Sequence, residues 1–379
     1  MTSARVGGAP VGLIGGVAYD NVFGTDRRWV GANGLKGEPS DDGYESVASL
    51  GVYGQGEWAI SPSITLTFGL RYDQVSYHFE SYFPGVVPFQ DRDYSQLSPR
   101  TTLAWRTGPN SLIYGSVARG FEVPAIGEIS DNPGSELHLL EPKTLWNFEV
   151  GGRGSLGSRL LYDAAVFYAD AQGEFVPVDA DGQYELKNAS QSRNFGIELS
   201  LTATILSWLE LSASYAYSDF RLQDFTNLVR DSANQIIPVD QSGSMLPAVP
   251  QNRVTAEARL RPVTGLLLGM QFEWQSLMYV ETGNQQSGIV YAFSPGPVAR
   301  PVPFRAVPPR VLMQLNAQLQ LSNFQIFATI QNLFGITYVG NVLPNAPNGA
   351  FYEAGSGRWV SLGVRLGFWP NGFSGGAVQ

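Results

Sequence analysis

The chain of 379 residues contains no cysteine and only two histidines. Disulfide bonds and thiolate metal sites are therefore excluded, although the redox compartment is left open. No run of about 18 consecutive apolar residues is present, which excludes a membrane-spanning helix of ordinary length. The first residues, MTSARVGGAP, lack the apolar core of a signal peptide. If the protein is exported, we expect its export signal to lie outside this chain.

Charge is also scarce. Asp, Glu, Lys and Arg together make up 15% of the chain, well below the roughly 25% that is usual in soluble domains. The net charge of −9 argues against nucleic acid as a partner. What the chain has instead is aromatic side chains, at 12% of residues, together with 43 glycines and 24 prolines. Turns should therefore be frequent.

Alternation of apolar and polar residues is the dominant pattern. The stretch GRWVSLGVRLGF at 357–368 places every second residue from Val360 to Phe368 on one apolar face, with Arg365 on the other. The clearest case is MQLNAQLQL at 313–321, in which the amide side chains form an unbroken row. A period of two predicts strands with one apolar and one polar face. About fourteen such strands are expected, at 11–22, 48–58, 63–73, 100–106, 111–120, 145–152, 160–169, 195–203, 209–218, 254–260, 266–275, 313–321, 324–332 and 357–368.

The connections between these strands alternate in length. Short turns such as TGPN at 107–110 and GSLG at 154–157 are separated by long connections at 23–44, 79–93, 121–142, 170–191, 220–247, 280–308 and 339–356. Outer-membrane barrels have short periplasmic turns and long extracellular loops, and their strands of about ten residues match the bilayer. The sequence therefore predicts an all-β fold, an antiparallel transmembrane outer-membrane β-barrel with its apolar face toward lipid. Aromatics near strand ends are expected to form interfacial girdles, namely Tyr72, Tyr77, Trp105, Trp208, Tyr217, Trp274 and Trp359.

Several motifs in a fixed order resemble the barrel of TonB-dependent outer-membrane receptors, which are mostly importers of ferric siderophores. They include FGLRYD at 68–73, YGSVARGFEVPAIGEI at 114–129, LLEPKTLWNFEVGGRG at 139–154 and IQNLFGITYV at 330–339, followed by GSGRWVSLGVRLGF. The family barrel has about 22 strands, so the resemblance implies that this chain covers a partial barrel, the last fourteen strands. The family's plug domain, and the segment ahead of it that contacts TonB, have no counterpart here.

The resemblance also divides the chain and assigns its partners. Residues 1–368 would form the barrel portion, and residues 369–379 a C-terminal tail. Phe368 resembles the terminal aromatic that the barrel assembly machinery reads, although eleven further residues follow it. The implied location is the outer membrane, with membrane lipid around the barrel and a ferric siderophore or related nutrient as ligand. TonB would act only through a plug that this chain lacks.

Ligand contacts are expected in the long connections, because binding residues concentrate on loops held by a rigid scaffold. Ferric siderophores are often anionic, which favours arginine and aromatic contacts. The candidates are Arg27, Arg28, Trp29, Tyr82, Phe83, Arg92, Arg119 and Arg230. The acidic stretch PSDDGYE at 39–45 is expected to be a solvated tip. His78 and His138 are expected to be exposed loop residues, so no metal site, cofactor or catalytic motif is predicted, and the protein is not expected to be an enzyme.

Two other classes remain open from the residues. One is a complete, smaller outer-membrane channel of about fourteen strands for small solutes or fatty acids, which fits the strand count but not the ordered motifs. The other is a soluble extracellular β protein that binds carbohydrate, which the apolar rows oppose because an exposed apolar belt would aggregate. A requirement for detergent separates the soluble class from the barrels, and TonB-dependent uptake of iron chelates separates the receptor from the channel.

Overall fold

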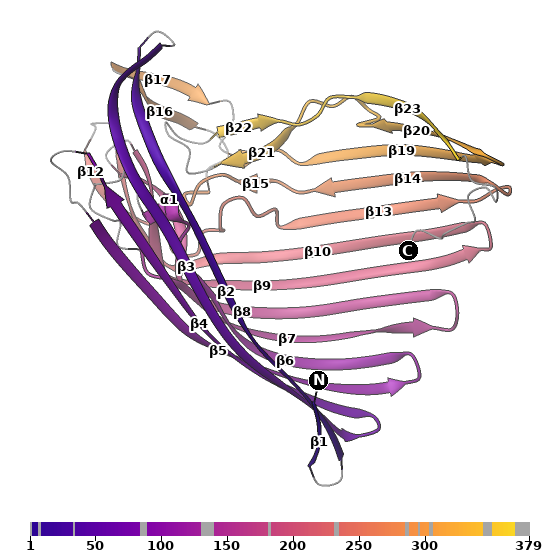
Figure 1. Cartoon of the computed structure of the whole chain (residues 1–379). Helices are drawn as coiled ribbons and strands as arrows, with labels where there is room; N and C mark the ends of the chain where they lie inside the picture. The colour runs from indigo at the N-terminus through magenta and orange to yellow at the C-terminus, as the bar shows by residue number, and fades with distance from the viewer. Residues whose placement is uncertain are drawn as a thin grey trace.

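The structure is a computed structural model, and it describes residues 2–6, 9–32, 35–83, 89–129, 140–180, 183–230, 235–284, 288–294, 296–302, 306–343 and 351–367. One large sheet dominates it (Figure 1). Fifteen strands follow one another in the order β1-β2-β3-β4-β5-β6-β7-β8-β9-β10-β13-β14-β19-β20-β23, and each pairs antiparallel with its neighbours. This arrangement confirms the predicted antiparallel all-β fold.

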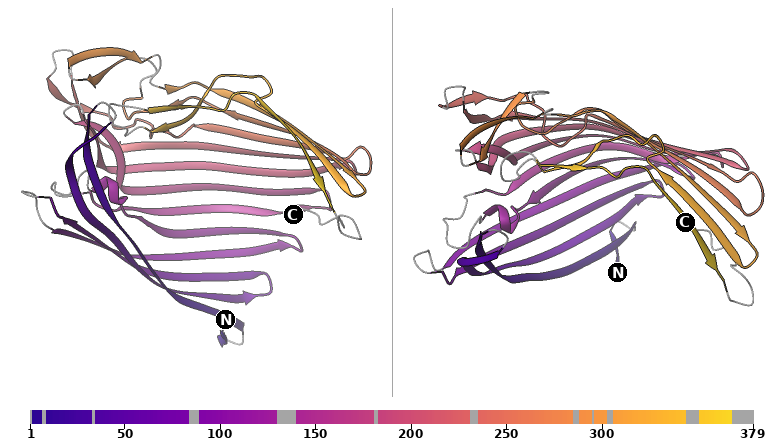
Figure 2. Two further views of the ribbon diagram at one scale, coloured as in Figure 1. Left: turned by 45° about the horizontal axis from the view of Figure 1, so that its top comes forward. Right: turned by 90° about the horizontal axis from the view of Figure 1, so that it is seen from above.

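The bounds of the sheet strands are β1 (Thr2–Val6), β2 (Ala9–Ala32), β3 (Leu35–Ser61), β4 (Ile64–Ser81), β5 (Phe89–Gly108), β6 (Ser111–Glu122), β7 (Lys143–Leu156), β8 (Leu160–Ala180), β9 (Gln183–Leu206), β10 (Leu209–Asp224), β13 (Asn252–Leu260), β14 (Leu266–Gln275), β19 (Arg310–Leu321), β20 (Phe324–Gln331) and β23 (Trp359–Leu366). All fourteen predicted strands are present, and β1 is an addition that the pattern did not reveal. Within the described residues, β1 and β23 stand at opposite ends of the strand order and no pairing joins them. The sheet curves into a trough between these ends (Figure 2).

Several strands run much further than the alternation predicted. β2, β3 and β9 contain 24, 27 and 24 residues, so most described residues of the expected long connections at 23–44 and 170–191 belong to the ladder. β4 and β5 extend into the expected connection at 79–93 as far as Ser81 and from Phe89. The remaining long connections carry small elements of their own, which are α1 (Ile126–Ile129) and the paired strands β11 (Thr226–Arg230) with β12 (Ile236–Asp240), β15 (Met278–Tyr279) with β18 (Ala306–Val307), β16 (Gly288–Ser294) with β17 (Gly296–Val302), and β21 (Val339–Leu343) with β22 (Phe351–Ala354). The long hairpins and these elements lie at one end of the sheet, opposite the short turns (Figure 1).

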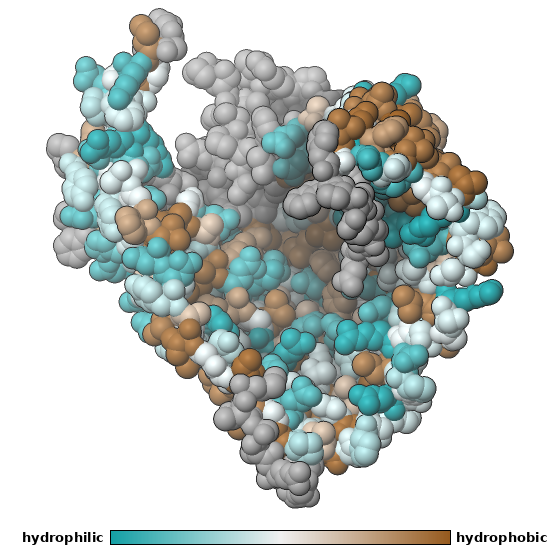
Figure 3. Space-filling view, turned by 45° about the vertical axis from the view of Figure 1, so that its right-hand side comes forward, coloured by the Kyte–Doolittle hydropathy of each residue, from teal (hydrophilic) through white to brown (hydrophobic). Residues whose placement is uncertain are grey.

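The register places the apolar residues of successive strands in continuous rows on one face. Val150 pairs with Val166, which pairs with Ile197 on the next strand. The same face carries the row from Ile330 to Val360 near the other end of the sheet. These side chains are exposed, as the 67% exposed Val360 illustrates, and hydrophobic side chains gather on the right-hand side that comes forward in Figure 3, where the last strands lie. An exposed apolar band of this extent is the lipid-facing surface of an outer-membrane barrel.

The other face, called the inner face below, is polar along its length. Gln271 pairs with Gln314 and with Glu257 on its other side, and the predicted amide row of β19 lies on this face. Compact apolar clusters occur on it only at the long-connection end, among the described residues. One cluster contains Val75, Tyr77, Phe79, Tyr94 and Ile129. A second contains Val176, Ala189, Leu222, Phe225 and Leu246. They fix the connections against the inside of the sheet rather than forming a central core.

Candidate functional site

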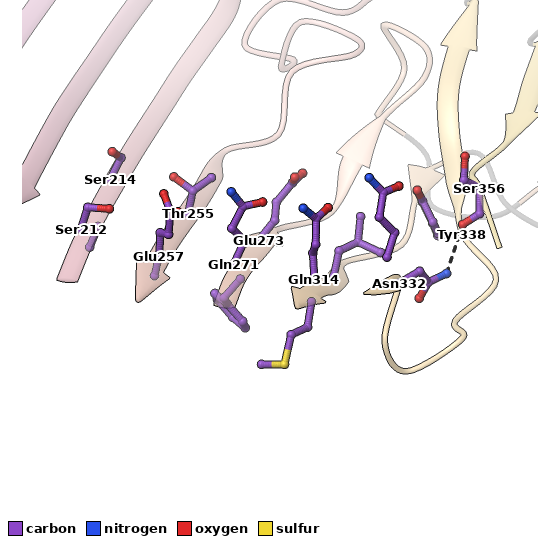
Figure 4. A pocket seen from close by; sticks show the side chains of 16 residues that line it. Ser212, Ser214, Thr255, Glu257, Gln271, Glu273, Gln314, Asn332, Tyr338 and Ser356 are labelled. Carbon is purple, nitrogen blue, oxygen red and sulfur yellow. Dashed lines mark hydrogen bonds between the residues drawn. The ribbon is translucent and has the colours of Figure 1, made fainter. Parts of the chain in front are cut away.

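A polar hollow of about 400 Å³ lies on the inner face toward the long-connection end (Figure 4). Strands β10, β13, β14 and β19 contribute neighbouring side chains because cross-strand partners share a face. Its labelled lining residues are Ser212, Ser214, Thr255, Glu257, Gln271, Glu273, Gln314, Asn332, Tyr338 and Ser356. Hydroxyl, amide and carboxylate groups of this kind can bind a ligand by hydrogen bonding. The side chains that line the hollow include no nucleophile hydrogen-bonded to a general base.

The segment that follows β20 closes one side of this hollow. The Asn332 side chain donates to the carbonyls of Ile336 and Ser356 at 2.8 and 3.1 Å and accepts from the Ile336 amide at 3.0 Å. Asn332 is buried and has a φ of 46°, a left-handed conformation that asparagine tolerates better than most residues. It therefore organises the turn in the motif IQNLFGITYV, to which the sequence pattern assigned no role.

Charges at the edge of the hollow are paired. Glu273 lies 3.4 Å from both Arg253 and Arg310. Arg310 is only 16% exposed, donates to the Val339 carbonyl at 2.7 Å, and stands 5.0 Å from the centre of the Tyr338 ring. The hollow is therefore lined by hydrogen-bonding groups, and the charges at its edge are balanced.

A second part of the inner face holds Arg92, one of the predicted contacts. Its guanidinium lies 3.3 Å from the Tyr94 hydroxyl and 3.1 Å from Glu141. The Tyr94 hydroxyl donates to the Leu140 carbonyl at 2.7 Å, and the Tyr77 hydroxyl donates to the Pro124 carbonyl at 2.6 Å. These bonds attach both ends of the β6–β7 connection to the inner face.

The predicted place of Tyr77 is wrong. It was expected in an outer aromatic girdle, but it is 3% exposed and packs on the inner face with Tyr94 and Ile129. It lies beyond Tyr72 on the long-connection side of the apolar band, and burial raises the pKa of its hydroxyl to about 12. Trp359 also belongs to the inner face, where its indole donates to Gln331.

The tip of the β2–β3 hairpin brings three other candidates together. Arg27 pairs with Asp42 at 3.1 Å, and Arg28 pairs with Asp26 at 2.7 Å. The Lys36 ammonium lies 3.4 Å from the centre of the Trp29 ring, a cation–π contact. The arginines are therefore neutralised within their own hairpin.

The acidic stretch of this hairpin is not simply a solvated tip. Asp41 is 5% exposed, and burial is the main cause that raises the pKa of its carboxyl. Burial, reinforced by Asp26, also raises the pKa of Glu45. Asp26 on β2 and the two acidic residues on β3 share a face because the strands are adjacent in the ladder.

The remaining candidates are scattered. Tyr82 is 55% exposed and donates to Glu80 at 3.0 Å, and the Phe83 amide donates to the Ser81 hydroxyl at 3.3 Å. The Arg119 guanidinium lies 5.9 Å from the Trp146 ring and shares the outer face with Val117. Arg230 ends β11. Phe368, the tail 369–379 and His138 lie outside the described residues.

His78 is half-exposed and has a carboxylate partner, with its Nδ1 2.6 Å from Asp91. In the described part of the chain, no group of three or more His, Asp or Glu side chains could hold a metal ion. No helix in the same part of the chain is long and apolar enough to cross a membrane.

The fold and the inner wall define a class of protein. The sheet is a long antiparallel meander with one lipid-facing apolar surface and one polar surface. It has short turns at one end and long hairpins at the other. This combination defines the wall of an outer-membrane β-barrel. The family model described as "TonB dependent receptor-like, beta-barrel" matches residues 3–333. The chain belongs to this family, whose members are receptors and transporters of the outer membrane rather than enzymes.

Individual relatives agree with this assignment. The chain is 26% identical over 185 residues to the "Iron-regulated outer membrane virulence protein" of Vibrio cholerae, which covers 43% of this chain and 26% of that protein. It is 23% identical over 260 residues to the "Probable TonB-dependent siderophore receptor PiuA" of Acinetobacter baumannii, covering 66% of this chain and 34% of the relative.

Solved structures share the fold. The crystal structure of PiuA aligns with a TM-score of 0.70 at 18% identity, over 96% of this chain and 54% of that chain. The ferric yersiniabactin uptake receptor FyuA of Yersinia pestis aligns with a TM-score of 0.71 at 16% identity, over 95% of this chain and 53% of that chain. The chain therefore spans about half the length of these receptors.

Proposed function

We propose that this chain is the barrel portion of an outer-membrane TonB-dependent receptor that takes up a ferric siderophore or a similar iron chelate. The observation that carries the proposal is the family match over residues 3–333, together with relatives whose names specify iron regulation or siderophore reception. Residues 1–368 would form the barrel and residues 369–379 a tail. The chain spans about half the length of the matched receptors, and TonB would act through a plug domain.

The inner face supports a role in binding an anionic chelate at the long-connection end. Arg92 is held between Tyr94 and Glu141 with its side chain 27% exposed, so it keeps donors available beside an aromatic ring. The polar hollow formed by β10, β13, β14 and β19 offers further hydrogen-bonding groups. Binding would require no covalent chemistry, and release would depend on TonB. Insertion would depend on the barrel assembly machinery, with Phe368 as the proposed signal.

Uptake tests this proposal directly. Because TonB would act through a plug domain, the chain would be exported to the outer membrane together with the plug domain of a family member, in a strain lacking its own siderophore receptors, with and without TonB. The cells would be supplied with radioactive iron as catecholate, hydroxamate or citrate chelates. Saturable uptake of at least one chelate that requires TonB is expected. TonB-independent passage of small solutes, with no chelate preference, would instead support the smaller channel and overturn the receptor proposal.

Binding can be measured separately by quenching of tryptophan fluorescence. The Arg92→Ala variant should bind the preferred chelate about tenfold more weakly, because a charge-assisted hydrogen bond contributes roughly 1.5–3 kcal/mol. Arg153→Ala, on the inner face near the short turns, is the matched control and should bind like the wild type. Equal binding by the two variants would show that Arg92 is not part of the ligand site.

A further inference from the structure

Arg100 on β5 is an exposed arginine of the inner face without a partner. It forms no hydrogen bond or ion pair with any residue that the structure describes. Arg92, the predicted ligand contact on the same strand, lies eight residues nearer the long-connection end. An even separation keeps both side chains on one face, and their positions are about 26 Å apart at the usual rise of about 3.3 Å per residue.

The row of side chains that crosses the inner face at Arg100 contains no other charge. Arg100 pairs with Gly69 on β4 and with Ala118 on β6. The row continues to Gln55 on β3 and to Asn147 on β7. Because cross-strand partners share a face, a single guanidinium stands alone across the neighbouring strands β3 to β7 (Figure 1).

The residues on either side of Arg100 leave room for a ligand. Gly69 has no side chain, and a Cβ atom added there would meet no atom nearer than 3.8 Å. Ala118 contributes only a methyl group. The next row supplies the hydroxyl groups of Thr102 and Ser116, which pair with each other across the strands. The guanidinium therefore faces an open polar surface whose hydroxyl groups can donate further hydrogen bonds to an oxyanion.

The carboxylates nearest to Arg100 do not offset its charge. The Arg71 guanidinium donates to both carboxylate oxygens of Asp73 at 2.8 Å, so this pair is neutral. Glu57 and Glu149 lie in the row of Thr102, each two strands from β5. Two strands amount to about 10 Å at the usual spacing of about 4.8 Å, and exposed charges are largely screened beyond about 8 Å at physiological ionic strength.

We infer, on the basis of the proposed function, that Arg100 is the centre of a second anion site, which holds the anionic chelate on its way from Arg92 to the periplasm. A guanidinium binds carboxylates and other oxyanions through two parallel hydrogen bonds. A positive charge on the wall of a narrow lumen also raises the local concentration of anions. Arg106, which is six residues further along the same face and has no partner among the described residues, continues the series toward the short turns.

The site can be tested without knowing the transported chelate, because the chain contains no cysteine. Thr102→Cys places a single thiol on the inner face, about 6.6 Å along the strand from Arg100. The full chain, folded in detergent, is treated with an anionic sulfonate or a cationic ammonium methanethiosulfonate reagent of similar size, and the two rates are compared. Adding Arg100→Gln should lower the anionic-to-cationic rate ratio at least about fivefold at low salt, whereas Arg100→Lys should preserve it because the charge remains.

Ser200→Cys provides the matched control thiol. Ser200 is exposed on the inner face of β9 and pairs with Asp163, so its thiol should favour the cationic reagent and should be unaffected by Arg100→Gln. A cold gel-shift assay of the folded barrel establishes that each variant folds. A rate ratio at the Thr102→Cys thiol that Arg100→Gln leaves unchanged would overturn the anion site.

Transit is tested by TonB-dependent uptake of the anionic catecholate and citrate chelates of iron, with the plug domain supplied as above. Arg100→Gln should slow uptake at least about fivefold, while equilibrium binding measured by tryptophan quenching stays at the wild-type level because Arg92 is intact. Arg365→Gln, which removes an exposed arginine from the inner face of β23, is the control and should transport like the wild type.

The outcomes separate the anion site from the receptor function. Wild-type uptake rates in folded Arg100→Gln would overturn the role of Arg100 in transit. Absence of TonB-dependent uptake by the wild type would refute the proposed function and the transit role together, and the thiol rate ratio would still decide whether Arg100 forms an anion site.

Discussion

Replacing Val166 with arginine is a direct test of which face meets lipid. Val166 lies midway along the outer apolar rows, between Val150 and Ile197 on the neighbouring strands. An arginine at the lipid-facing midplane of an outer-membrane barrel costs about 2–4 kcal/mol. We therefore expect the Val166→Arg variant to lose about 2–4 kcal/mol of unfolding free energy, measured by guanidinium titration in lipid vesicles with tryptophan fluorescence.

The matched control places the same residue on the opposite face at a similar height. Ser200 is exposed on the inner face of β9 and pairs with Asp163, so an arginine there meets an opposite charge across the strands. Such a pair contributes roughly 0.2–1 kcal/mol, and Ser200→Arg should change stability by less than about 1 kcal/mol. If the two variants lost equal stability, or Ser200→Arg lost more, the assignment of the two faces would be refuted.

Three further outcomes are expected at the long-connection end. Tyr77→Phe leaves the Pro124 carbonyl without its donor and should cost about 1–3 kcal/mol locally, seen as faster proteolysis of the β6–β7 connection. Because burial raises the Tyr77 pKa to about 12, the wild-type advantage should be full below the ordinary value of 10.0 and disappear as the pH rises through about 12. Gly173→Ala should lose about 1–2 kcal/mol because Gly173 has a φ of 71°, whereas Gly127→Ala, where an added Cβ meets no neighbour, should be nearly neutral in the same thermal melt. Asp41→Asn should slow hydrogen exchange of the hairpin tip at neutral pH and match the wild type in acid. Because the pKa of Asp41 is raised, the stabilisation that its protonated carboxyl gives is present below the ordinary pKa of 3.8 and is lost as the pH rises. Slower exchange of the variant at both pH values would contradict this reasoning.

The membrane-spanning part of the wall could be predicted from sequence because lipid and lumen select different side chains at alternate positions. The amide row of β19 faces the lumen and the apolar row of β23 faces lipid, so both rows follow from that selection. Beyond the membrane both faces meet water or other connections, and the alternation fades. For this reason the sequence predicts loops where β2 and β3 extend beyond the membrane.

Parity along a strand could have placed Tyr77 correctly. Tyr77 is four residues from Asp73, a charged residue that alternates with the apolar row Phe68, Leu70 and Tyr72. An even separation keeps two strand residues on one face. Trp359 could have been placed in the same way from its neighbour Val360. Being aromatic and near a strand end is a weaker signal than the face on which the residue lies.

The contacts that fold the connections inward could not be predicted from local patterns. Asn188 accepts a hydrogen bond from the Glu141 amide at 2.8 Å and donates to the Glu141 carbonyl at 2.8 Å, across 47 residues of sequence. Its amide group also donates to the Gly173 carbonyl at 2.8 Å. Such contacts depend on which connections meet above the sheet, and a period of two carries no information about that. The ligand contacts proposed from the loops stay predictions for the same reason.

The strict neighbour-to-neighbour order of the sheet has a consequence for how such a wall can change in evolution. Every strand from β1 to β9 pairs only with the strands before and after it in the chain. A two-strand unit can therefore be added to or removed from an edge without rethreading any other strand, and the inside–outside alternation of the rest is preserved. The wall is modular in steps of one hairpin, so its circumference can vary among relatives while each remaining hairpin keeps its lipid-facing and lumen-facing surfaces.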